Sequence, residues 1–363
     1  MSVYCLTQSC KNKIFYFVFV QESSVEMRII MYILNCNQPS KIEATTFSDL
    51  HMKEKDIEEI LRKNVDMLCD DEESMLIVGQ QVRNVSNGRS DLTAIDNNGD
   101  IVLIEIKRDK ADIIGRKESF EFQAIRYAAS CATIKSTDEL IQNVFSPYVE
   151  KHRDEFEQQY ELTSSEIAKR QLNDFVEMNN ITIFNARQRI ILVASEFDEQ
   201  TLSAVAWLNS NQVDISCYQI YPYKINDTIL IDMKKILPIV EYDDFYVNVV
   251  EKGNIQKKQK KDISRRSLPK IDALIEWGVV NEGDIIVAKG CTEEAQLQAN
   301  GQVKIENDIM SLQQWLKKVF HWSSVETYKF SVHKKTGKTL SELRQEYMEQ
   351  NIDNNISNTQ NIE

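Results

Sequence analysis

The stretch from Gly88 to Arg108 constrains the fold of this chain more than any other part of the sequence. It contains a half-apolar run, 90–95, and a mostly apolar run, 101–107, separated by the sequence Asp-Asn-Asn-Gly-Asp. Asn and Gly readily adopt the positive φ angles of tight turns, and the second run is rich in Ile and Val, which favour strands. The sequence therefore predicts a β-hairpin whose second strand is apolar enough to lie inside a sheet.

The second predicted strand carries two charges on one of its faces. Alternate residues of a strand point to the same side, so one face carries Leu103, Glu105 and Lys107. The other face is apolar and is formed by Val102, Ile104 and Ile106. Charges inside a fold are costly unless they are paired or bind a metal ion. The hairpin can bring a further carboxylate, that of Asp91, close to Glu105.

Two carboxylates and a lysine in this arrangement suit phosphodiester hydrolysis. Neighbouring carboxylates repel each other, and a divalent cation relieves the repulsion; Mg²⁺ prefers carboxylate oxygen, water and substrate phosphate as ligands. Such an ion makes a bound water more acidic and shields the charge of the scissile phosphate. Lys107 could orient that water or stabilise the transition state. An ordinary surface hairpin with a Glu-Ile-Lys triplet is the alternative interpretation.

The pattern Asp91…Glu105-x-Lys107 resembles the motif of the PD-(D/E)XK nuclease superfamily, with Ser90 where many members have proline. In that superfamily these residues carry metal binding and catalysis. The resemblance implies that Asp91 and Glu105 hold Mg²⁺ or Mn²⁺ and that Lys107 acts on the attacking water. It also implies an α/β fold with a restriction-endonuclease-like mixed central sheet flanked by helices.

Helices on either side of the hairpin extend the resemblance. An amphipathic helix from Glu54 to about Asn64 precedes it, and a helix over 122–128 follows, in which Gln123 and Tyr127 share a face. In a subgroup of the superfamily, a glutamate of the first helix assists the metal, and the Gln and Tyr support the site or touch DNA. By this pattern Glu54 is a catalytic residue and metal ligand, with Glu58 as the alternative. The plainer alternatives are a solvated helix face for these acids and a packing role for the second pair.

Further strands and helices extend this domain to about residue 249. Strands are predicted at 75–82, 188–194 and 213–221, and helices at 140–180 and 201–208. Apolar strands that alternate with helices indicate a buried mixed sheet. This half also resembles the later part of an uncharacterised bacterial nuclease family, so the nuclease-like domain is assigned to residues 45–249. Arg187 and Arg189 are expected to be solvent-exposed, with phosphate contact as the alternative.

Residues 1–44 are expected to form an N-terminal extension with two strands, around Phe17 and at 30–34, with Met31 as an alternative start. The first apolar run is short and lacks the cleavage site of a signal peptide, and no run is long enough to cross a membrane. The seven cysteines include no Cys-x-x-Cys pair. This usage favours reduced thiols in a cytoplasm and argues against a zinc site.

The formal net charge of −13 opposes simple electrostatic binding to DNA, because phosphate contacts by Lys and Arg dominate such affinity. Basic residues nevertheless cluster just after the hairpin, where Arg108 is expected to contact DNA, and within a flexible linker over 250–266. Net charge governs solubility and encounter rate, but it does not determine the chemistry of a site.

A small α+β domain is predicted over 267–347. Its expected elements are a helix at 271–278, a strand near 285–289, a hairpin about the dipeptide Asn300-Gly301, a helix at 311–319, a strand at 326–332 and a last helix capped near Thr339. The opening Leu-Ile-x-x-Gly-x-x-x-x-Gly-Asp, the hairpin and the closing Gly-Lys-Thr-Leu-Ser-Glu-Leu-Arg resemble the restriction-system and adenine-methylase-associated (RAMA) module. That family is proposed to read modified DNA, although the middle of this segment departs from its pattern.

Two aromatic residues of this domain, Trp322 and Tyr328, could stack on a base, with a place in the domain core as the alternative. The Asn-rich residues 348–363 are expected to form a disordered tail. Together the resemblances predict a metal-dependent DNA endonuclease, a phosphodiester hydrolase of restriction or defence against foreign or methylated DNA. Restriction-like enzymes usually need two active sites to cut both strands, so a homodimer is a possible form of this protein. A non-catalytic DNA-binding protein on the same fold and a protein–protein adaptor are the alternatives.

Overall fold

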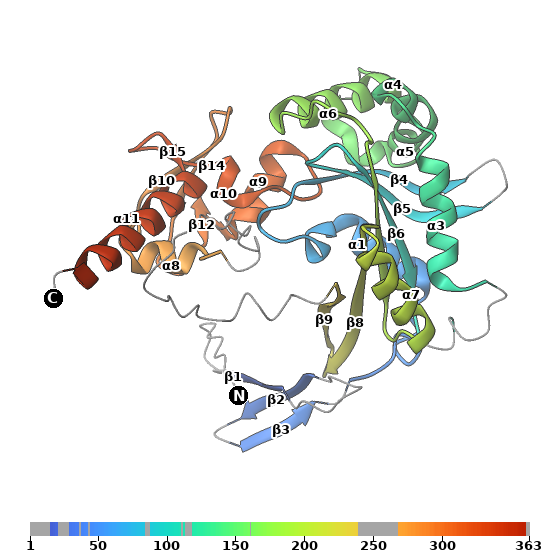
Figure 1. The fold of residues 1–363 in the computed structure, drawn as a ribbon, viewed down its shortest axis with the longest axis horizontal. Helices are drawn as coiled ribbons and strands as arrows, with labels where there is room; N and C mark the ends of the chain where they lie inside the picture. The colour runs from blue at the N-terminus through green and yellow to red at the C-terminus, as the bar shows by residue number, and fades with distance from the viewer. Residues whose placement is uncertain are drawn as a thin grey trace.

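A six-stranded mixed sheet forms the centre of the first domain (Figure 1). In spatial order its strands are β4 (Met75–Arg83), β5 (Arg89–Asp96), β6 (Ile101–Lys107), β7 (Gln188–Ala194), β8 (Ile215–Ile225) and β9 (Thr228–Leu237). The inner strands β6, β7 and β8 run parallel, and the outer pairs are antiparallel. This computed structural model describes residues 15–20, 29–35, 38–42, 44–83, 88–109, 112, 118–159, 161–238 and 268–360.

The predicted hairpin and the strands around it are confirmed. β5 and β6 pair antiparallel on either side of the turn at Gly99, whose φ of 86° a residue with a side chain rarely adopts. β4, β7 and β8 lie where apolar runs predict strands. β9 is absent from the strands expected above. It is an edge strand whose side chains stay at least partly exposed, and its apolar residues are interrupted by Asp232 and two lysines.

Helices cover both faces of this sheet. They are α1 (Glu54–Lys63), η1 (Val65–Leu68), α3 (Phe120–Cys131), α4 (Thr137–Leu140), η2 (Ile141–Phe145), α5 (Ser146–Lys151), η3 (Arg153–Gln159), α6 (Ser164–Met178) and α7 (Glu199–Ser210). The two faces of β6 separate as the alternation predicts. Leu103 packs in the core under α3 and α7, whereas Val102 and Ile104 pack in the larger core with α1, α5 and α6.

A small antiparallel sheet precedes this domain. It consists of β1 (Phe15–Val20), β2 (Ile29–Asn35) and β3 (Gln38–Ile42). The first two strands confirm the expectation for the two apolar patches, and β3 is a further strand, at a position where no strand is predicted. The predicted linker over 250–266 lies outside the described residues.

The second domain contains a six-stranded antiparallel sheet. Its strands are β10 (Ile285–Ala288), β11 (Glu294–Leu297), β12 (Val303–Ile305), β13 (Asp308–Met310), β14 (Ser331–His333) and β15 (Lys338–Thr339). Its helices are α8 (Ile271–Glu276), α9 (Leu312–Phe320), α10 (Thr327–Phe330) and α11 (Leu340–Gln360). The predicted hairpin at Asn300-Gly301 is confirmed by the pairing of β11 with β12.

One expectation for this domain is wrong. The predicted strand at 326–332 begins instead as the short helix α10, and only 331–333 form a strand. α10 buries Thr327, Tyr328 and Phe330, so these side chains enter the core from a helix. α11 runs on through Gln360, into the segment expected to form the tail.

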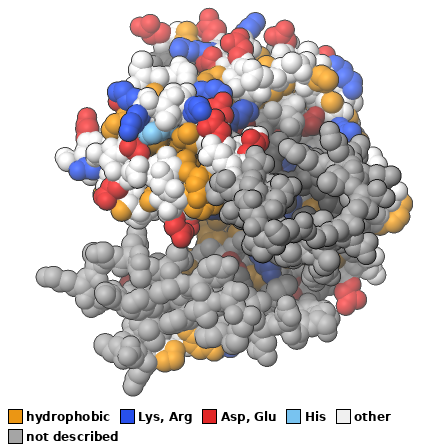
Figure 2. Space-filling model, turned by 60° about the vertical axis from the view of Figure 1, so that its left-hand side comes forward, with side chains coloured by type: hydrophobic (Ala, Val, Ile, Leu, Met, Phe, Trp, Pro, Cys, Tyr) orange, Lys and Arg blue, Asp and Glu red, His pale blue; other side chains and the backbone are white. Residues whose placement is uncertain are grey.

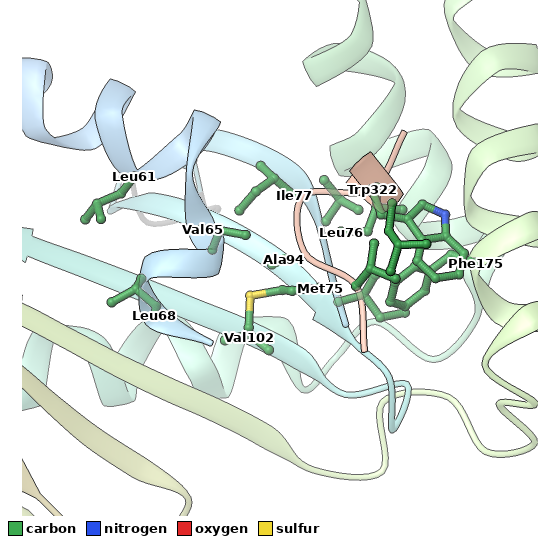
Figure 3. Close-up of a cluster of buried hydrophobic side chains, with 14 of the residues drawn as sticks. Leu61, Val65, Leu68, Met75, Leu76, Ile77, Ala94, Val102, Phe175 and Trp322 are labelled. Atoms are coloured by element: carbon green, nitrogen blue, oxygen red, sulfur yellow. The ribbon is translucent and has the colours of Figure 1, made fainter. Parts of the chain in front are cut away.

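The second domain is packed directly against the first, beside β4 (Figure 1). The backbones of Met75 and Ser324 exchange two hydrogen bonds, at 3.1 and 2.8 Å, so the segment around Ser324 extends the edge of the central sheet. The ring of Trp322 lies 4.8 Å from that of Phe175 on α6, edge to face. Figure 3 shows Trp322 beside Leu76 and Phe175 in one continuous cluster. The two sheets therefore share a core.

A buried ion pair also joins the two domains. Arg344 of α11 donates to the Glu72 carboxylate at 2.8 Å, and both residues are less than 10% exposed. We expect Arg344→Met to lower the free energy of unfolding by about 3–5 kcal/mol, because it leaves Glu72 buried without its partner. Urea unfolding of the full chain would measure this loss.

A control variant and a double variant test that prediction further. Lys338→Ala breaks the ion pair between Lys338 of β15 and Glu346 of α11, whose side chains are 47% and 45% exposed, so it should cost at most about 1 kcal/mol. Combining Arg344→Met with Glu72→Leu should recover part of the loss, since no charge is then left buried. Equal effects of Arg344→Met and Lys338→Ala would contradict the prediction.

Among the described residues, no helix has both the length and the apolar character that crossing a membrane requires.

Candidate active site

The hairpin brings Asp91, Glu105 and Lys107 together near the carboxyl end of β6. The pairing of Leu92 with Ile104 places Asp91 beside Glu105 on the neighbouring strand. The three residues are 7%, 0% and 1% exposed, respectively. A surface hairpin would leave them in water, so that alternative is wrong. Burial of three ionisable groups at one point is costly unless they interact with one another or with a ligand.

Asp91 and Lys107 are held by the backbone of the hairpin. The backbone N–H of Ile106 donates to Asp91 Oδ2 at 2.8 Å, and Lys107 Nζ lies 3.9 Å from the same oxygen. Lys107 Nζ also donates to the Ile106 carbonyl at 2.6 Å and lies 5.0 Å from the centre of the Phe120 ring. Lys107 Nζ is therefore fixed between a carboxylate, a carbonyl and an aromatic face, where it points toward Asp91.

Glu105 is the least satisfied member of the cluster. Its Oε2 accepts a hydrogen bond from Gln123 at 3.4 Å, but its buried Oε1 has no hydrogen-bond partner among the described residues. Burial, followed by the charge of Asp91, raises the pKa of Glu105 to about 9. An acceptor oxygen in this situation requires either a proton or a cation.

The two acids of α1 reach the site differently. At the start of α1 the Asp56 side chain accepts the N–H of Lys53, the N-cap residue, at 2.7 Å, and Asp56 also places a negative charge in the first turn. The Glu54 carboxylate lies 3.7 Å from Lys107 Nζ and its side chain is 34% exposed. Glu58, one turn later, is 2% exposed, so a solvated face is wrong for this acid.

Glu58 is connected to the hairpin through a glutamine that sequence analysis does not single out. The amide of Gln81 on β4 donates both to Glu58 and, at 3.2 Å, to Asp91 Oδ1. Burial and the charge of Asp91 raise the pKa of Glu58, and its Oε1 is buried without a partner in the part of the chain that the structure describes. The only sequence signal for Gln81 is a pair of amides at the end of an apolar strand.

Gln123 and Tyr127 face the site from α3, as their spacing predicts. Gln123 Nε2 lies within 3.4 Å of both Glu105 Oε2 and the Tyr127 hydroxyl. That hydroxyl accepts the backbone N–H of Arg89, at the start of β5, at 3.0 Å. The pair therefore connects α3 to the hairpin and to one catalytic candidate.

The three arginines considered as phosphate or DNA contacts differ from one another in their surroundings. Arg108 Nε lies 3.0 Å from Asp112 and 3.4 Å from Asp109, so a phosphate would have to compete with two carboxylates. Arg187 is exposed as expected. The expectation of exposure is wrong for Arg189, which is 8% exposed and lies 3.2 Å from Glu73.

The base-stacking role predicted for Trp322 and Tyr328 is corrected by the structure. Trp322 is 4% exposed, and its ring contacts the rings of Phe175, Phe320 and Phe330. Tyr328 is 3% exposed, and the guanidinium of Arg344 lies 4.5 Å from the centre of its ring. Both faces of a ring packed in this way are unavailable to a base, so these residues belong to the core.

The donor set at the hairpin fits a hard divalent cation. The unpartnered Glu105 oxygen lies beside Asp91, and the Ile106 carbonyl faces the same cluster, so the oxygen ligands that Mg²⁺ prefers are present. Within the described ranges, no group of three or more His, Cys, Asp or Glu side chains is placed to hold a metal ion. Mg²⁺ commonly keeps several waters and needs only one or two carboxylates.

The fold and site define a mixed α/β protein with a buried Asp, Glu and Lys cluster at the end of its central sheet. No protein-family model matches this chain, and no curated protein matches it.

On the face drawn in Figure 2, Lys and Arg side chains are interspersed with Asp and Glu. The chemistry of the cluster is therefore the main guide to function.

Proposed function

We propose that this protein is a metal-dependent DNA endonuclease that hydrolyses phosphodiester bonds at Asp91, Glu105 and Lys107. One observation carries the proposal: two adjacent carboxylates and a lysine are buried together, and a Glu105 oxygen has no partner among the described residues. A purely structural cluster would satisfy that oxygen or replace the glutamate by an apolar residue.

Each residue has a role that follows from its position. Asp91 and Glu105 would hold Mg²⁺ or Mn²⁺, which when bound acidifies water and shields the phosphate charge. Lys107, fixed 3.9 Å from Asp91, would orient the attacking water and offset the charge that develops on the phosphate. Gln123 holds Glu105 in place, and Tyr127 anchors the start of β5.

The substrate and setting rest on the resemblances described above. DNA, foreign or modified, is the proposed substrate, and the second domain is the proposed reader of modification. Its docking beside β4 keeps it against the catalytic domain. Since one site cuts one strand, a homodimer is the proposed form for double-strand cleavage, and a cytoplasmic location is proposed from the cysteine usage.

The test is nicking of supercoiled plasmid, unmodified and methylated, with Mg²⁺ or with EDTA. We expect Mg²⁺-dependent nicking that falls by about 10²- to 10³-fold in Lys107→Ala and in Asp91→Ala. Lys338→Ala and Asp308→Ala, which change exposed residues of the second domain, should cut like the wild type. Intact DNA binding without cleavage of either plasmid would favour a binding protein on this fold. Absence of both would favour an adaptor.

A further inference from the structure

Gln81 occupies a backbone conformation that a strand residue rarely adopts. Its φ is 58°, in the left-handed region, which is strained for a residue with a side chain. β4 is already irregular just before it, because its register with β5 shifts between Ile77 and Gly79. Bulges of this kind redirect side chains and occur near active sites. The strain must therefore be compensated by contacts that the conformation permits.

The conformation lets the Gln81 amide reach two carboxylates. In a regular strand Gln80 and Gln81 would point to opposite faces; here the Gln81 amide donates to Glu58 and to Asp91. Gln80 instead points to α5 and the residue after it, where its Oε1 accepts from Lys151 Nζ at 2.7 Å and lies 2.9 Å from His152 Nε2. Among the hydrogen bonds of the described residues, Gln81 acts through its Nε2, which donates to both Glu58 and Asp91.

A glutamine amide suits this position because it has two N–H donors and no charge. Glu58 and Asp91 repel each other, and one N–H directed at each carboxylate offsets that repulsion without neutralising either acid. A lysine would neutralise part of the negative charge that a cation needs, and a glutamate would add to the repulsion. The side chain thus joins α1 to the hairpin while it preserves the negative charge of the site.

We infer that Gln81 is a positioning residue that fixes Glu58 beside Asp91 and so shapes the cation site from the side of α1. The inference rests on the proposed function and adds Glu58, through this bridge, to the α1 acids that act on the site, beside Glu54. Groups that orient metal ligands in this way typically change metal affinity by about 10- to 100-fold when they are removed.

The test measures Mn²⁺ binding to the full-length protein without DNA, by electron paramagnetic resonance of free Mn²⁺. Gln81→Leu keeps the size of the side chain and removes both donors, so we expect Mn²⁺ affinity to fall about 10- to 100-fold. Gln81→Gly removes the same donors but relieves the backbone strain, and it should lose a similar factor while unfolding at the same or higher urea concentration. Gln219→Leu, at a half-buried glutamine of β8, is the matched control and should bind like the wild type.

The outcomes separate this inference from the proposed function. If the wild type binds Mn²⁺ and both Gln81 variants bind it equally well, the positioning role is overturned and the proposed function stands. If only Gln81→Leu loses affinity and Gln81→Gly does not, the backbone alone matters and the inference is overturned. If the wild type binds no Mn²⁺ at millimolar concentration, the proposed metal dependence fails, and the inference fails with it.

Discussion

Glu105→Gln should abolish the Mg²⁺-dependent cleavage that we propose and should also reduce the loss of stability that the metal-free protein undergoes as the pH rises. Burial, followed by the charge of Asp91, raises the pKa of Glu105 from 4.5 to about 9 in the folded chain. The folded state therefore retains a proton that the unfolded state loses between these pH values. The stability associated with the neutral carboxyl is fully present below about pH 4.5 and is lost as the pH rises through about 9.

This single group should lower the free energy of unfolding by up to about 1.4 kcal/mol for each pH unit in that window. Glutamine does not titrate, so urea unfolding in EDTA at pH 5, 7 and 8.5 should show a shallower decline for Glu105→Gln than for the wild type. Glu282→Gln, at an exposed position, should keep the slope of the wild type. Parallel pH profiles for the wild type and Glu105→Gln would refute the assignment, as would plasmid nicking that survives in the variant.

Trp322→Ala should destabilise the whole chain by about 3–5 kcal/mol, the usual cost of removing a large buried ring. Trp322 is 4% exposed and contacts Phe175 of the first domain as well as two rings of its own domain. Because the two sheets share this core, both domains should lose stability together, and urea unfolding should remain one transition.

Trp207→Ala provides the matched control, since the same residue type is 64% exposed there and its loss should cost less than about 0.5 kcal/mol. Far-ultraviolet circular dichroism and tryptophan fluorescence would report the transition independently. A first domain that unfolds at an unchanged urea concentration in Trp322→Ala would show that the interface contributes little to its stability.

The sequence predicts the hairpin and its catalytic candidates because their arrangement is local. Asp91, Glu105 and Lys107 belong to two adjacent strands, and the alternation of side chains along β6 is enough to place two of them on one face. Periodicity likewise locates α1, α3 and the strands β4 to β8. It does not reveal β9, whose half-exposed edge has a weaker apolar pattern.

Other features of the site and the core depend on contacts between residues far apart in the sequence, which the local pattern does not reveal. Glu54 and Glu58 are four residues apart on α1, and only the packing of α1 against the sheet buries the second. Gln81 depends on a register shift and a positive φ that no local composition specifies. Trp322 is a core residue because α6 of the other domain supplies Phe175, a neighbour distant in sequence.

The segment that extends β4 comes from far along the chain. Glu326 donates its backbone N–H to Ser74 Oγ across 252 residues. At about 5–20 residues per second, a ribosome needs roughly 10 to 50 s to make that intervening stretch. Until then the edge of β4 lacks this partner, and an unpaired strand edge is a template for aggregation. The pairing of Met75 with Ser324 can therefore form only after most of the second domain has been made.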